Sequence, residues 1–381
     1  MSDTQGAAPG NGGRQWMMLA FAAVIVLAAA GYGLYWLMHG HFYEETDNAY
    51  VGGNVVQITP LVGGVVISVN TDDTRPVKAG QVLAQLDPTD ARVALSQAVG
   101  ELAQTVRQVR TIYGNNDQYA AALAARQTDL ARSRDDLRRR EQAGGAVSRE
   151  ELDHARAAVQ AAEANVAAAW TQLNSNRTLA GQSDVANHPN VVQAAARLRG
   201  AYLSLVRTAI LAPVDGYVAQ RSVQIGQRVG PGSVLMAVVP LDQVWVEANF
   251  TEVHLERVRL GQPVELTADL YGSGVVYHGS VAGFSPGTGG AFALLPAQNA
   301  TGNWIKVVQR LPVRIALNPK ELAEHPLRIG LSMQATIDLH NQSGKQVSAV
   351  SAAPAYKTDV YARQAAEADA IVAKIIAENE R

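Results

Sequence analysis

Apolar residues between positions 88 and 208 alternate three and four residues apart, which is the spacing of a coiled-coil seam. The outgoing seam consists of Leu95, Val99, Leu102, Val106, Val109 and Tyr113, and the returning seam of Leu152, Ala155, Val159, Ala162, Val166, Ala169 and Leu173. The glycine pair Gly144-Gly145 lies between them. The pattern predicts an antiparallel α-helical coiled-coil hairpin over residues 88–208, with arms roughly 80 Å long at ~1.5 Å per residue.

Helix-capping residues mark the start of each arm. Asp87 precedes Pro88, a favoured pair for an N-cap and a first helical position. Ser148-Arg-Glu-Glu151 has the pattern of a capping box for the returning helix. Gly114-Asn-Asn116 and Gly181 to Asn190 interrupt the seams, so we expect each arm to break there. Beyond the second interruption the seam resumes with Val191, Ala195, Leu198, Tyr202 and Leu205.

A glycine-centred β motif occurs once before the hairpin and once after it. The first copy contains Pro60-Leu-Val-Gly63 and a further glycine at Gly80, and the second contains Pro213-Val-Asp-Gly216 and Gly232. Neither half is long enough to bury both faces of its short strands alone. We therefore predict one small β sandwich, made of residues 46–87 and 209–240, into which the hairpin is inserted.

Residues 16–38 form an apolar run without charged residues, long enough to cross a bilayer of ~30 Å as a helix. Trp16, Tyr35 and Trp36 lie toward its ends, where aromatic side chains anchor transmembrane helices. A signal peptide cleaved near Ala30 is the alternative, but the run continues eight residues beyond that point. We therefore predict a single uncleaved transmembrane helix.

The residues that flank this run predict its orientation. Residues 1–15 are small, polar and glycine-rich, and we expect them to be disordered. Arg14 precedes the run, the next Lys or Arg is Arg75, and several acidic residues come soon after the run. By the positive-inside rule, the N-terminus is predicted to be cytoplasmic and residues 39–381 to lie on the opposite side.

Residues 241–340 contain short runs of alternating polarity separated by Gly and Pro, which is typical of a small antiparallel β barrel. The expected strands are 244–250, 262–268, 275–281, 305–308, 313–317 and 333–339. Residues 341–381 are interpreted as a linker followed by a short amphipathic helix over 361–379. Together, the predicted elements define an elongated, multidomain α+β protein.

Charge and cysteine content exclude several functions. The net charge of −2 gives no electrostatic reason for nucleic-acid binding, and the absence of cysteine excludes disulfides, thiolate catalysis and Cys-ligated metals. The arginines within residues 132–140 alternate with acidic residues, so they are interpreted as solvated helix faces rather than a polyanion site. The sequence has no nucleophile elbow, phosphate loop, dinucleotide fingerprint or paired-histidine motif. We therefore expect no catalytic, metal or cofactor site.

The two β halves resemble biotinyl/lipoyl domains. In carriers of that family, the modified lysine lies at the tip of the hairpin that joins the two halves. Here the helical arms occupy that joint, and the nearest lysine, Lys78, lies in a turn within the first half. A cofactor-carrying function is therefore disfavoured.

The order of the elements resembles that of the HlyD-like membrane fusion proteins, or periplasmic adaptors. Thr208–Val218 resembles the family signature at the return into the second β half, and both Phe292–Arg314 and Thr46–Val51 are similar to EmrA-type multidrug export adaptors. The resemblance implies attachment to a bacterial inner membrane with the bulk of the chain in the periplasm. It also implies three partners: an EmrB-type major-facilitator drug/proton antiporter, a TolC-like outer-membrane channel, and further copies of the chain in a trimeric or hexameric ring.

The same resemblance implies that the hairpin tip docks on the channel. Tips of the family commonly carry an Arg, a Leu four residues on and a Ser seven further. This chain has Arg138 and Ser148, but the spacing is one residue short, Gln142 stands in place of the Leu, and Ser148 has a capping role. The expected docking residues are Arg138, Arg139, Gln142, Gly144, Gly145, Val147 and Ser148.

Two other functions stay open at this point. A type I secretion adaptor that serves an ABC exporter would have the same architecture, but its deletion would affect a secreted polypeptide instead of drug tolerance. A periplasmic module that holds the drug directly would bind it as a purified protein.

Overall fold

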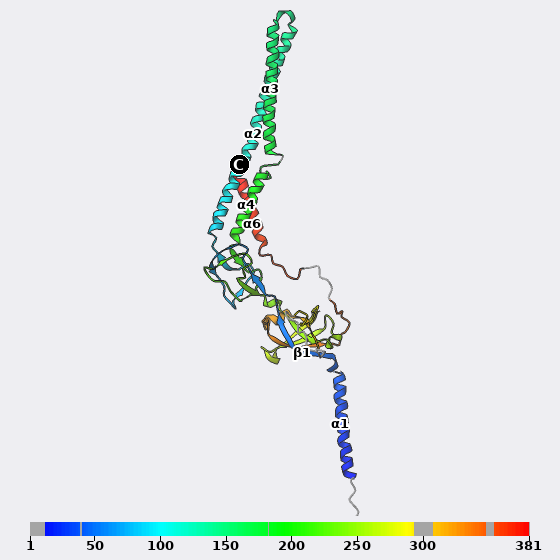
Figure 1. Ribbon diagram of the computed structural model, residues 1–381. Coiled ribbons are helices and arrows are strands. Elements are labelled where there is room, and N and C mark those ends of the chain that lie inside the picture. Colours follow the sequence, from blue (N-terminus) through cyan, green and yellow to red (C-terminus); the bar gives the residue numbers. More distant parts are fainter. Residues whose placement is uncertain (1–11, 39, 182, 293–307, 348–353, 381) are drawn as a thin grey trace, which may run out of the picture. The chain divides into compact units, whose positions relative to one another are not determined.

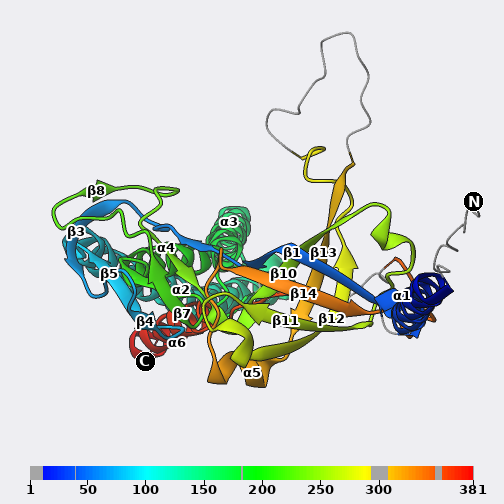
Figure 2. The same ribbon diagram turned by 90° about the horizontal axis from the view of Figure 1, so that it is seen from below.

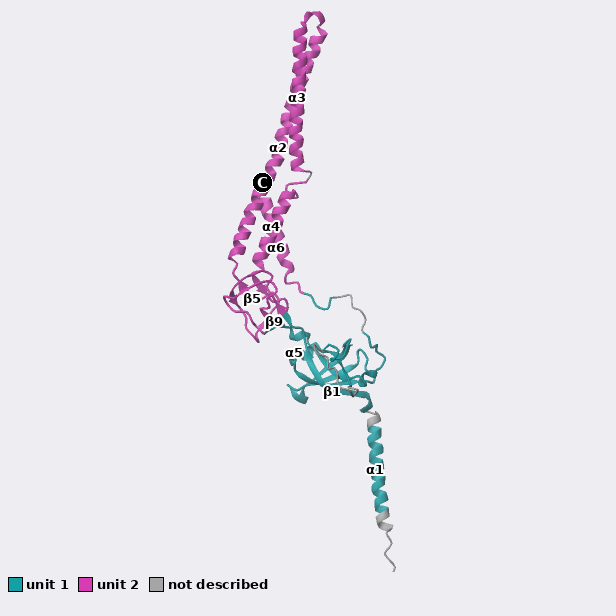
Figure 3. Cartoon of the chain, in the orientation of Figure 1, with its two compact units in different colours: residues 1–56, 215–219, 237–357 teal, residues 57–214, 220–236, 358–381 magenta. Residues whose placement is uncertain are grey.

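The computed structural model describes residues 12–38, 40–181, 183–292, 308–347 and 354–380. The chain divides into two compact units, which Figure 3 colours separately. The first contains residues 1–56, 215–219 and 237–357, and the second contains residues 57–214, 220–236 and 358–381. The disorder expected for residues 1–11 lies outside the described residues, whereas residues 12–15 are helical.

Helix α1 (Gly12–Met38) contains the apolar run and is followed by the short helix η1 (Gly40–Phe42). None of the most apolar part of this helix is buried against the protein. Trp16 and Tyr35 are exposed, and the side chain of Trp36 lies outside the described residues. A long apolar helix that is not buried against the protein matches the core of a bilayer, although a signal sequence has the same composition.

A closed six-stranded barrel has the strand order β1-β10-β13-β12-β11-β14 (Figure 2). Its strands are β1 (Tyr43–Gly52), β10 (Trp245–Thr251), β11 (Pro263–Ala268), β12 (Val276–Phe284), β13 (Arg310–Leu317) and β14 (Ser332–Asp338). All six neighbouring pairs are antiparallel. The barrel expected from the sequence is therefore confirmed, and most of the predicted strand 305–308 lies outside the described residues.

Strand β1 requires a correction, because the sequence analysis placed residues 46–52 in the β sandwich. In the structure β1 pairs with β10 through Ala49 and Ala248, and with β14 through Tyr43 and Asp338. These two ladders close the barrel. Without β1, the strands that follow residue 241 would form an open sheet with two unpaired edges, which proteins avoid.

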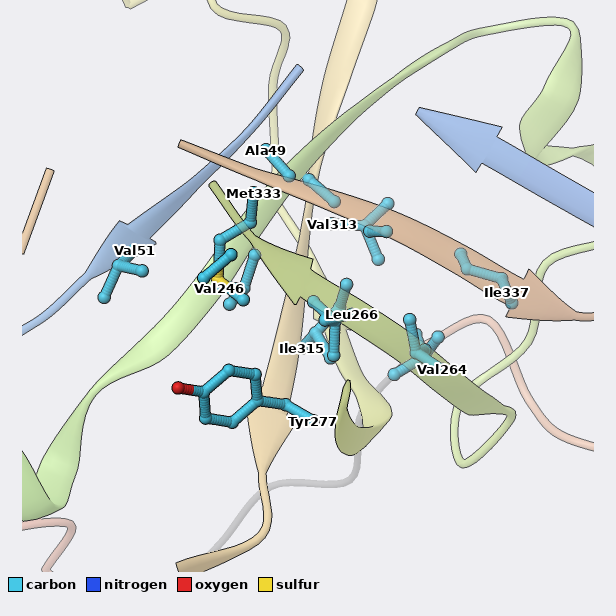
Figure 4. Close-up of a cluster of buried hydrophobic side chains, with 14 of the residues drawn as sticks. Ala49, Val51, Val246, Val264, Leu266, Tyr277, Val313, Ile315, Met333 and Ile337 are labelled. Carbon is cyan, nitrogen blue, oxygen red and sulfur yellow. The ribbon is translucent and has the colours of Figure 1, made fainter. Parts of the chain in front are cut away.

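The barrel interior is filled by alternate residues of its strands (Figure 4). In β10, for example, Val246, Ala248 and Phe250 are buried and the residues between them are more exposed. Phe250 and Tyr277 are the largest of these fully buried side chains. Three short helices, η3 (Leu241–Gln243), η4 (His254–Glu256) and η5 (Gly272–Gly274), and helix α5 (Pro319–Glu324) lie in the connections.

The β sandwich contains strands from both sides of the hairpin. One sheet has the order β6-β5-β3-β8, with β3 (Gly64–Val69), β5 (Val82–Leu86), β6 (Ala209–Leu211) and β8 (Arg228–Val229). The other has the order β2-β9-β7-β4, with β2 (Val56–Ile58), β4 (Pro76–Val77), β7 (Gly216–Ala219) and β9 (Met236–Val239). Interleaving of the two halves confirms the split domain.

The repeated glycines explain why both halves turn in the same way. Gly80 and Gly232 have φ angles of +82° and +87°, in the left-handed region that favours glycine. Lys78 lies exposed beside the first of these turns, where its backbone N–H donates to Gln81 Oε1 (3.0 Å). Its position is that of a turn residue.

The helical hairpin consists of α2 (Thr89–Gln142), α3 (Arg149–Ala180) and α4 (Pro189–Val206) (Figure 1). Asp87 caps α2, accepting from the N–H of Thr89 (3.0 Å). The predicted break between Ala180 and Pro189 is confirmed, but the break predicted at Gly114-Asn-Asn116 is wrong, since α2 continues through it. Gly and Asn each cost about 1 kcal/mol or less inside a helix, which packing against the returning arm outweighs.

The predicted seams are the buried faces of these helices. Leu102, Val106 and Val109 in α2 and Ala155 and Leu173 in α3 are buried. The other residues of the two predicted seams are intermediate in exposure, and their neighbours outside the seams are mostly exposed. Coiled-coil periodicity therefore predicted the packing face of both arms correctly.

The C-terminal helix α6 (Ala362–Asn379) packs beside α2 and α4, as Figure 1 shows in red. Val372 and Ile375 join the apolar cluster that α2 and α4 form near the β sandwich. Exposed polar contacts surround this face: Arg199–Asp369 (2.5 Å), Tyr202–Glu367 (2.8 Å) and Arg107–Asn379 (2.6 Å). The proximal part of the hairpin is therefore a three-helix bundle.

Candidate functional site at the hairpin tip

One short helix reverses the chain at the tip. Helix α2 ends at Gln142, and the short helix η2 (Gly144–Ala146) follows. Gly144 has φ +54°, the left-handed conformation that commonly ends helices and that glycine adopts without steric cost. Nothing lies within 4 Å of a Cβ placed on Gly144 or Gly145, so the backbone of the glycine pair faces open space.

A complete capping box starts the returning helix. Ser148 Oγ accepts from the N–H of Glu151 (3.2 Å), while Glu151 Oε2 accepts from the N–H (2.9 Å) and the hydroxyl (3.0 Å) of Ser148. The backbone bond from Ser148, followed by its hydroxyl bond, holds the pKa of the Glu151 carboxyl below its usual value. The polar groups of Ser148 are therefore used inside the tip, which they stabilise.

The arginines near the tip are paired within their own helix. Arg138 lies 2.7 Å from Asp135, and Arg139 and Arg140 lie 3.8 Å and 2.8 Å from Asp136. Such exposed pairs contribute little to stability, typically less than ~1 kcal/mol each. The two carboxylates offset two of the three arginine charges, so the end of the hairpin is not a bare cationic patch.

In the described distal half of the hairpin, two ion pairs join the two arms: Arg134 on α2 lies 2.7 Å from Glu163 on α3, and a second pair lies closer to the tip. Arg156 Nη2 on α3 lies 3.8 Å from Glu141 Oε1 on α2. The sequence analysis did not find this pair. Its only signal in the sequence was opposite charge, since Glu141 lies three residues before the Gly144-Gly145 turn and Arg156 eleven residues after it.

All seven residues expected at the tip lie together at the end of α2, in η2 and at the start of α3. Six are exposed and Val147 is half-buried. The groups exposed to a partner include the Gln142 side chain, the open side of the glycine pair and one face of Val147. Such a surface offers hydrogen bonds and a small apolar contact, so it is suited to recognition. Within the described part of the chain, no group of three or more His, Asp or Glu residues could hold a metal ion.

The architecture defines the class of protein. A single N-terminal apolar helix, a β sandwich split by a helical hairpin, and a six-stranded barrel are the elements of membrane fusion proteins, also called periplasmic adaptors. A family model described as the EmrA alpha-helical hairpin domain matches residues 89–208, which closely coincide with helices α2 to α4.

Curated relatives narrow this class to one family. The multidrug export protein EmrA of Escherichia coli (strain K12) is 47% identical over 319 residues, covering 83% of this chain and 82% of EmrA. The fatty acid resistance protein FarA of Neisseria gonorrhoeae is 55% identical over 297 residues, covering 77% of this chain and 75% of FarA. The chain belongs to the EmrA-type family of periplasmic adaptors. A solved structure of the periplasmic adaptor protein EmrA is 19% identical, with a TM-score of 0.39 over 78% of this chain and 99% of that structure.

Proposed function

We propose that the chain is the periplasmic adaptor of a tripartite export pump. EmrA-type adaptors work with an inner-membrane transporter and an outer-membrane channel, and family membership rests on 47% identity to EmrA over most of both chains. The proposed partners are a major-facilitator drug/proton antiporter of the EmrB type and a TolC-like channel. In this arrangement the adaptor is not an enzyme, and the antiporter supplies the energy from the proton gradient.

The apolar helix and the adaptor relatives indicate a membrane-anchored periplasmic protein. We place α1 in the inner membrane, with the N-terminus in the cytoplasm and the barrel, sandwich and hairpin in the periplasm. Arg14 before the span and the acidic residues after it support this orientation. Exposed Trp16 and Tyr35 toward the two ends of the span support their role as interfacial anchors.

Docking of the tip on the channel rests chiefly on one observation. The coiled coil ends in a tight turn followed by the capping box of α3, and nothing lies within 4 Å of a Cβ placed on Gly144 or Gly145. Capping fixes the geometry of the turn before any partner binds, and such preorganisation lowers the entropy cost of docking. Several copies of the chain, three or six in a ring, would present several such tips to the channel together.

The cargo is proposed from the names of the relatives. EmrA of E. coli is described as a multidrug export protein, FarA as a fatty acid resistance protein, and EmrA of Acinetobacter baumannii (31% identical over 331 residues) as a colistin resistance protein. We propose apolar and amphiphilic toxic compounds as the cargo. Fatty acids form a second candidate class, favoured by the 55% identity to FarA.

A photocrosslinking experiment in cells tests the docking. A photoreactive amino acid replaces Val147 in the full-length chain, and the matched control has it at the exposed residue Gln160 on the shaft of α3. We expect Val147 to capture an outer-membrane channel and Gln160 not to do so. Capture of nothing, or only of another copy of the chain, would contradict docking through the tip.

Export assays test the pump itself. Deletion of the gene should lower tolerance to apolar drugs or long-chain fatty acids, and Val147→Asp should do the same at unchanged protein level. The control is Gln160→Asp, which should retain export. Unchanged tolerance together with loss of a secreted polypeptide would favour a type I secretion adaptor. Direct binding of drug by the purified chain, with normal export by tip variants, would favour a drug-binding module.

A further inference from the structure

We call residues 181–188, which connect α3 and α4, the joint. The joint and the end of α3 before it contain buried polar side chains in an otherwise apolar coiled coil. Asn176 is 7% exposed and His188 is 5% exposed. Asn176 Nδ2 on α3 donates to the carbonyl of Ile112 (2.8 Å) and to Asn116 Oδ1 (2.9 Å), both on α2. Buried polar contacts of this kind fix the register of paired helices. The two arms are therefore locked together immediately before the joint.

A side chain of α2 also contacts the end of α3 and the connection after it. The hydroxyl of Tyr113 lies between the carbonyl oxygens of Ala180 and Ser183, with 2.8 Å to the former. Gly181, at the end of α3, has φ +70° and ψ −165°, a conformation that glycine adopts readily and that ends the helix. Helix α2 continues past this point without a break. The joint thus interrupts one arm and leaves the other as a continuous support.

His188 connects the two helices that meet at this joint. Its Nδ1 accepts from the backbone N–H of Asn190 (3.3 Å), which makes it the N-cap of α4. Its Nε2 lies 3.1 Å from the carbonyl oxygen of Leu179 in the last turn of α3. A carbonyl oxygen only accepts, so Nε2 must carry the hydrogen and Nδ1 must be bare. Both bonds exist together only in the neutral imidazole with its hydrogen on Nε2.

Protonation would remove one of these two bonds. An imidazolium has a hydrogen on both nitrogens, so Nδ1–H would face the N–H of Asn190 as donor against donor. The new charge would also lie buried at the N-terminus of α4, where the helix dipole disfavours a cation. The nearby acidic group, Asp184, already accepts from the side chain of Asn187 (2.6 Å).

The other ionisable groups on the surrounding elements would do little to stabilise a charged His188. Tyr113 on α2 lies against the carbonyls of the joint. The helices that meet here also carry Arg110 on α2 and Arg177 in the last turn of α3, so a charge on His188 would add to charges of the same sign on these elements. Helix α6 contributes Glu378, which lies 3.9 Å from Lys374 on its own helix.

We propose that the joint is a proton-operated hinge in the hairpin. Neutral His188 ties the last turn of α3 to the first turn of α4 and keeps the returning arm aligned. Protonated His188 uncaps α4 and frees the joint, so the distal part of the hairpin, which bears the tip, bends about the continuous α2. Histidine is the side chain that changes charge between about pH 5 and 8, a range that a periplasmic or external compartment can reach.

Spin labels measure the hinge directly, because the chain contains no cysteine and introduced cysteines are unique. Gln172→Cys on α3 and Gln193→Cys on α4 place one label on each side of the joint, both at exposed positions. In the full-length protein in detergent, we expect the distance distribution to shift and widen between about pH 7.5 and pH 5.5. The control pair, Gln160→Cys with Gln172→Cys, lies within α3 and should not change.

Two variants assign the response to His188. His188→Asn keeps an N-cap acceptor but cannot titrate, so its distribution should stay narrow at both pH values. His154→Asn removes an exposed histidine elsewhere on α3 and should leave the response intact. An unchanged wild-type distribution, or an equal shift in His188→Asn, would overturn the proposal.

Hydrogen exchange gives a second readout in the same protein. After correction for the intrinsic pH dependence of exchange, the amides of residues 190–192 should exchange about five- to tenfold faster at the lower pH, as expected for loss of one N-cap. The amides of α2 beside Tyr113 should not change by a comparable factor. Equal acceleration of both helices would mean general loosening of the coiled coil and would contradict a hinge at His188.

Discussion

Because α6 packs on the hairpin through an apolar face, substitution of Ile375 should measurably lower the stability of this attachment. This side chain is 8% exposed and packs in the cluster that contains Leu102 of α2 and Leu198 of α4, both fully buried. Ile375→Ala removes most of its apolar contact and leaves a cavity, because the long helices on either side cannot close around the smaller residue. Such substitutions cost about 2–5 kcal/mol, and the partial exposure of Ile375 places it near 2–3 kcal/mol.

The polar contacts of α6 do not compensate for this loss. The Arg199–Asp369 ion pair joins side chains that are 42% and 61% exposed, and exposed pairs contribute less than ~1 kcal/mol. The apolar face of α6 therefore dominates its attachment. Because α6 lies at the end of the chain, it can open locally without unfolding the barrel or the rest of the hairpin.

Hydrogen exchange of the full-length protein measures this opening. At about 1.4 kcal/mol per factor of ten, Ile375→Ala should accelerate exchange in residues 362–379 by ~30- to ~150-fold. The control is Lys374→Ala on the same helix, whose side chain is 75% exposed and which should change exchange only slightly. Equal exchange in both variants would refute the reasoning, as would acceleration that extends to the barrel strands.

Two further predictions concern pH. Burial raises the pKa of Tyr277 to about 12, and its hydroxyl donates to the carbonyl of His325 (3.0 Å). Since the folded pKa is above the unfolded value, the barrel should keep its stability below about pH 10 and lose it as pH rises toward 12. Denaturant unfolding of the wild type and of Tyr277→Phe should show this dependence in the wild type alone. The pKa of Glu151 is lowered, so the capping box is present above about pH 4.3 and is lost as pH falls below it. Exchange at residues 149–152 should rise there in the wild type, whereas Ser148→Ala should exchange fast already at neutral pH.

The hairpin was predictable because its signal is local. Leu102 and Val106 follow one another at helical spacing, and the same side of the helix is buried along the whole arm. The capping residues Asp87 and Ser148 act within three positions of their own place in the chain. Local patterns of this kind are visible in any sequence, so the seams, the turn and the caps are all found where the sequence predicts them.

Strand β1 could not be assigned from such signals. Its partners lie about two hundred and about three hundred residues further along the chain, so no local pattern identifies them. Proximity in sequence to Gly63 and Gly80 suggested the wrong sheet. Strand β1 joins the barrel because it pairs with the two edge strands β10 and β14 and so closes the sheet. These two strands are distant from β1 in sequence.

The tip illustrates a second limit. Its residues were predicted from a family pattern, and the structure places them together, but it also shows that Ser148 and Arg138 have partners inside the hairpin. A sequence motif does not distinguish a side chain that binds a partner protein from one that stabilises the turn in which it lies. The exposed Gln142 stands where this chain departs from the family pattern, and the glycine pair beside it is open to a partner.

Of the two expected breaks, only the one in the returning arm is present. The physical reason for this also determines which helix supports the tip. Both segments contain residues unfavourable to a helix, but Asn116 obtains a partner in Asn176, whereas the returning arm ends α3 at Gly181, with φ +70°, and starts a new helix at Pro189. Helix α2 is therefore the single element that spans from the three-helix base, held by α6, to the tip. Bending at the joint must be absorbed by α2, so the stiffness of that one helix limits how far the tip can move.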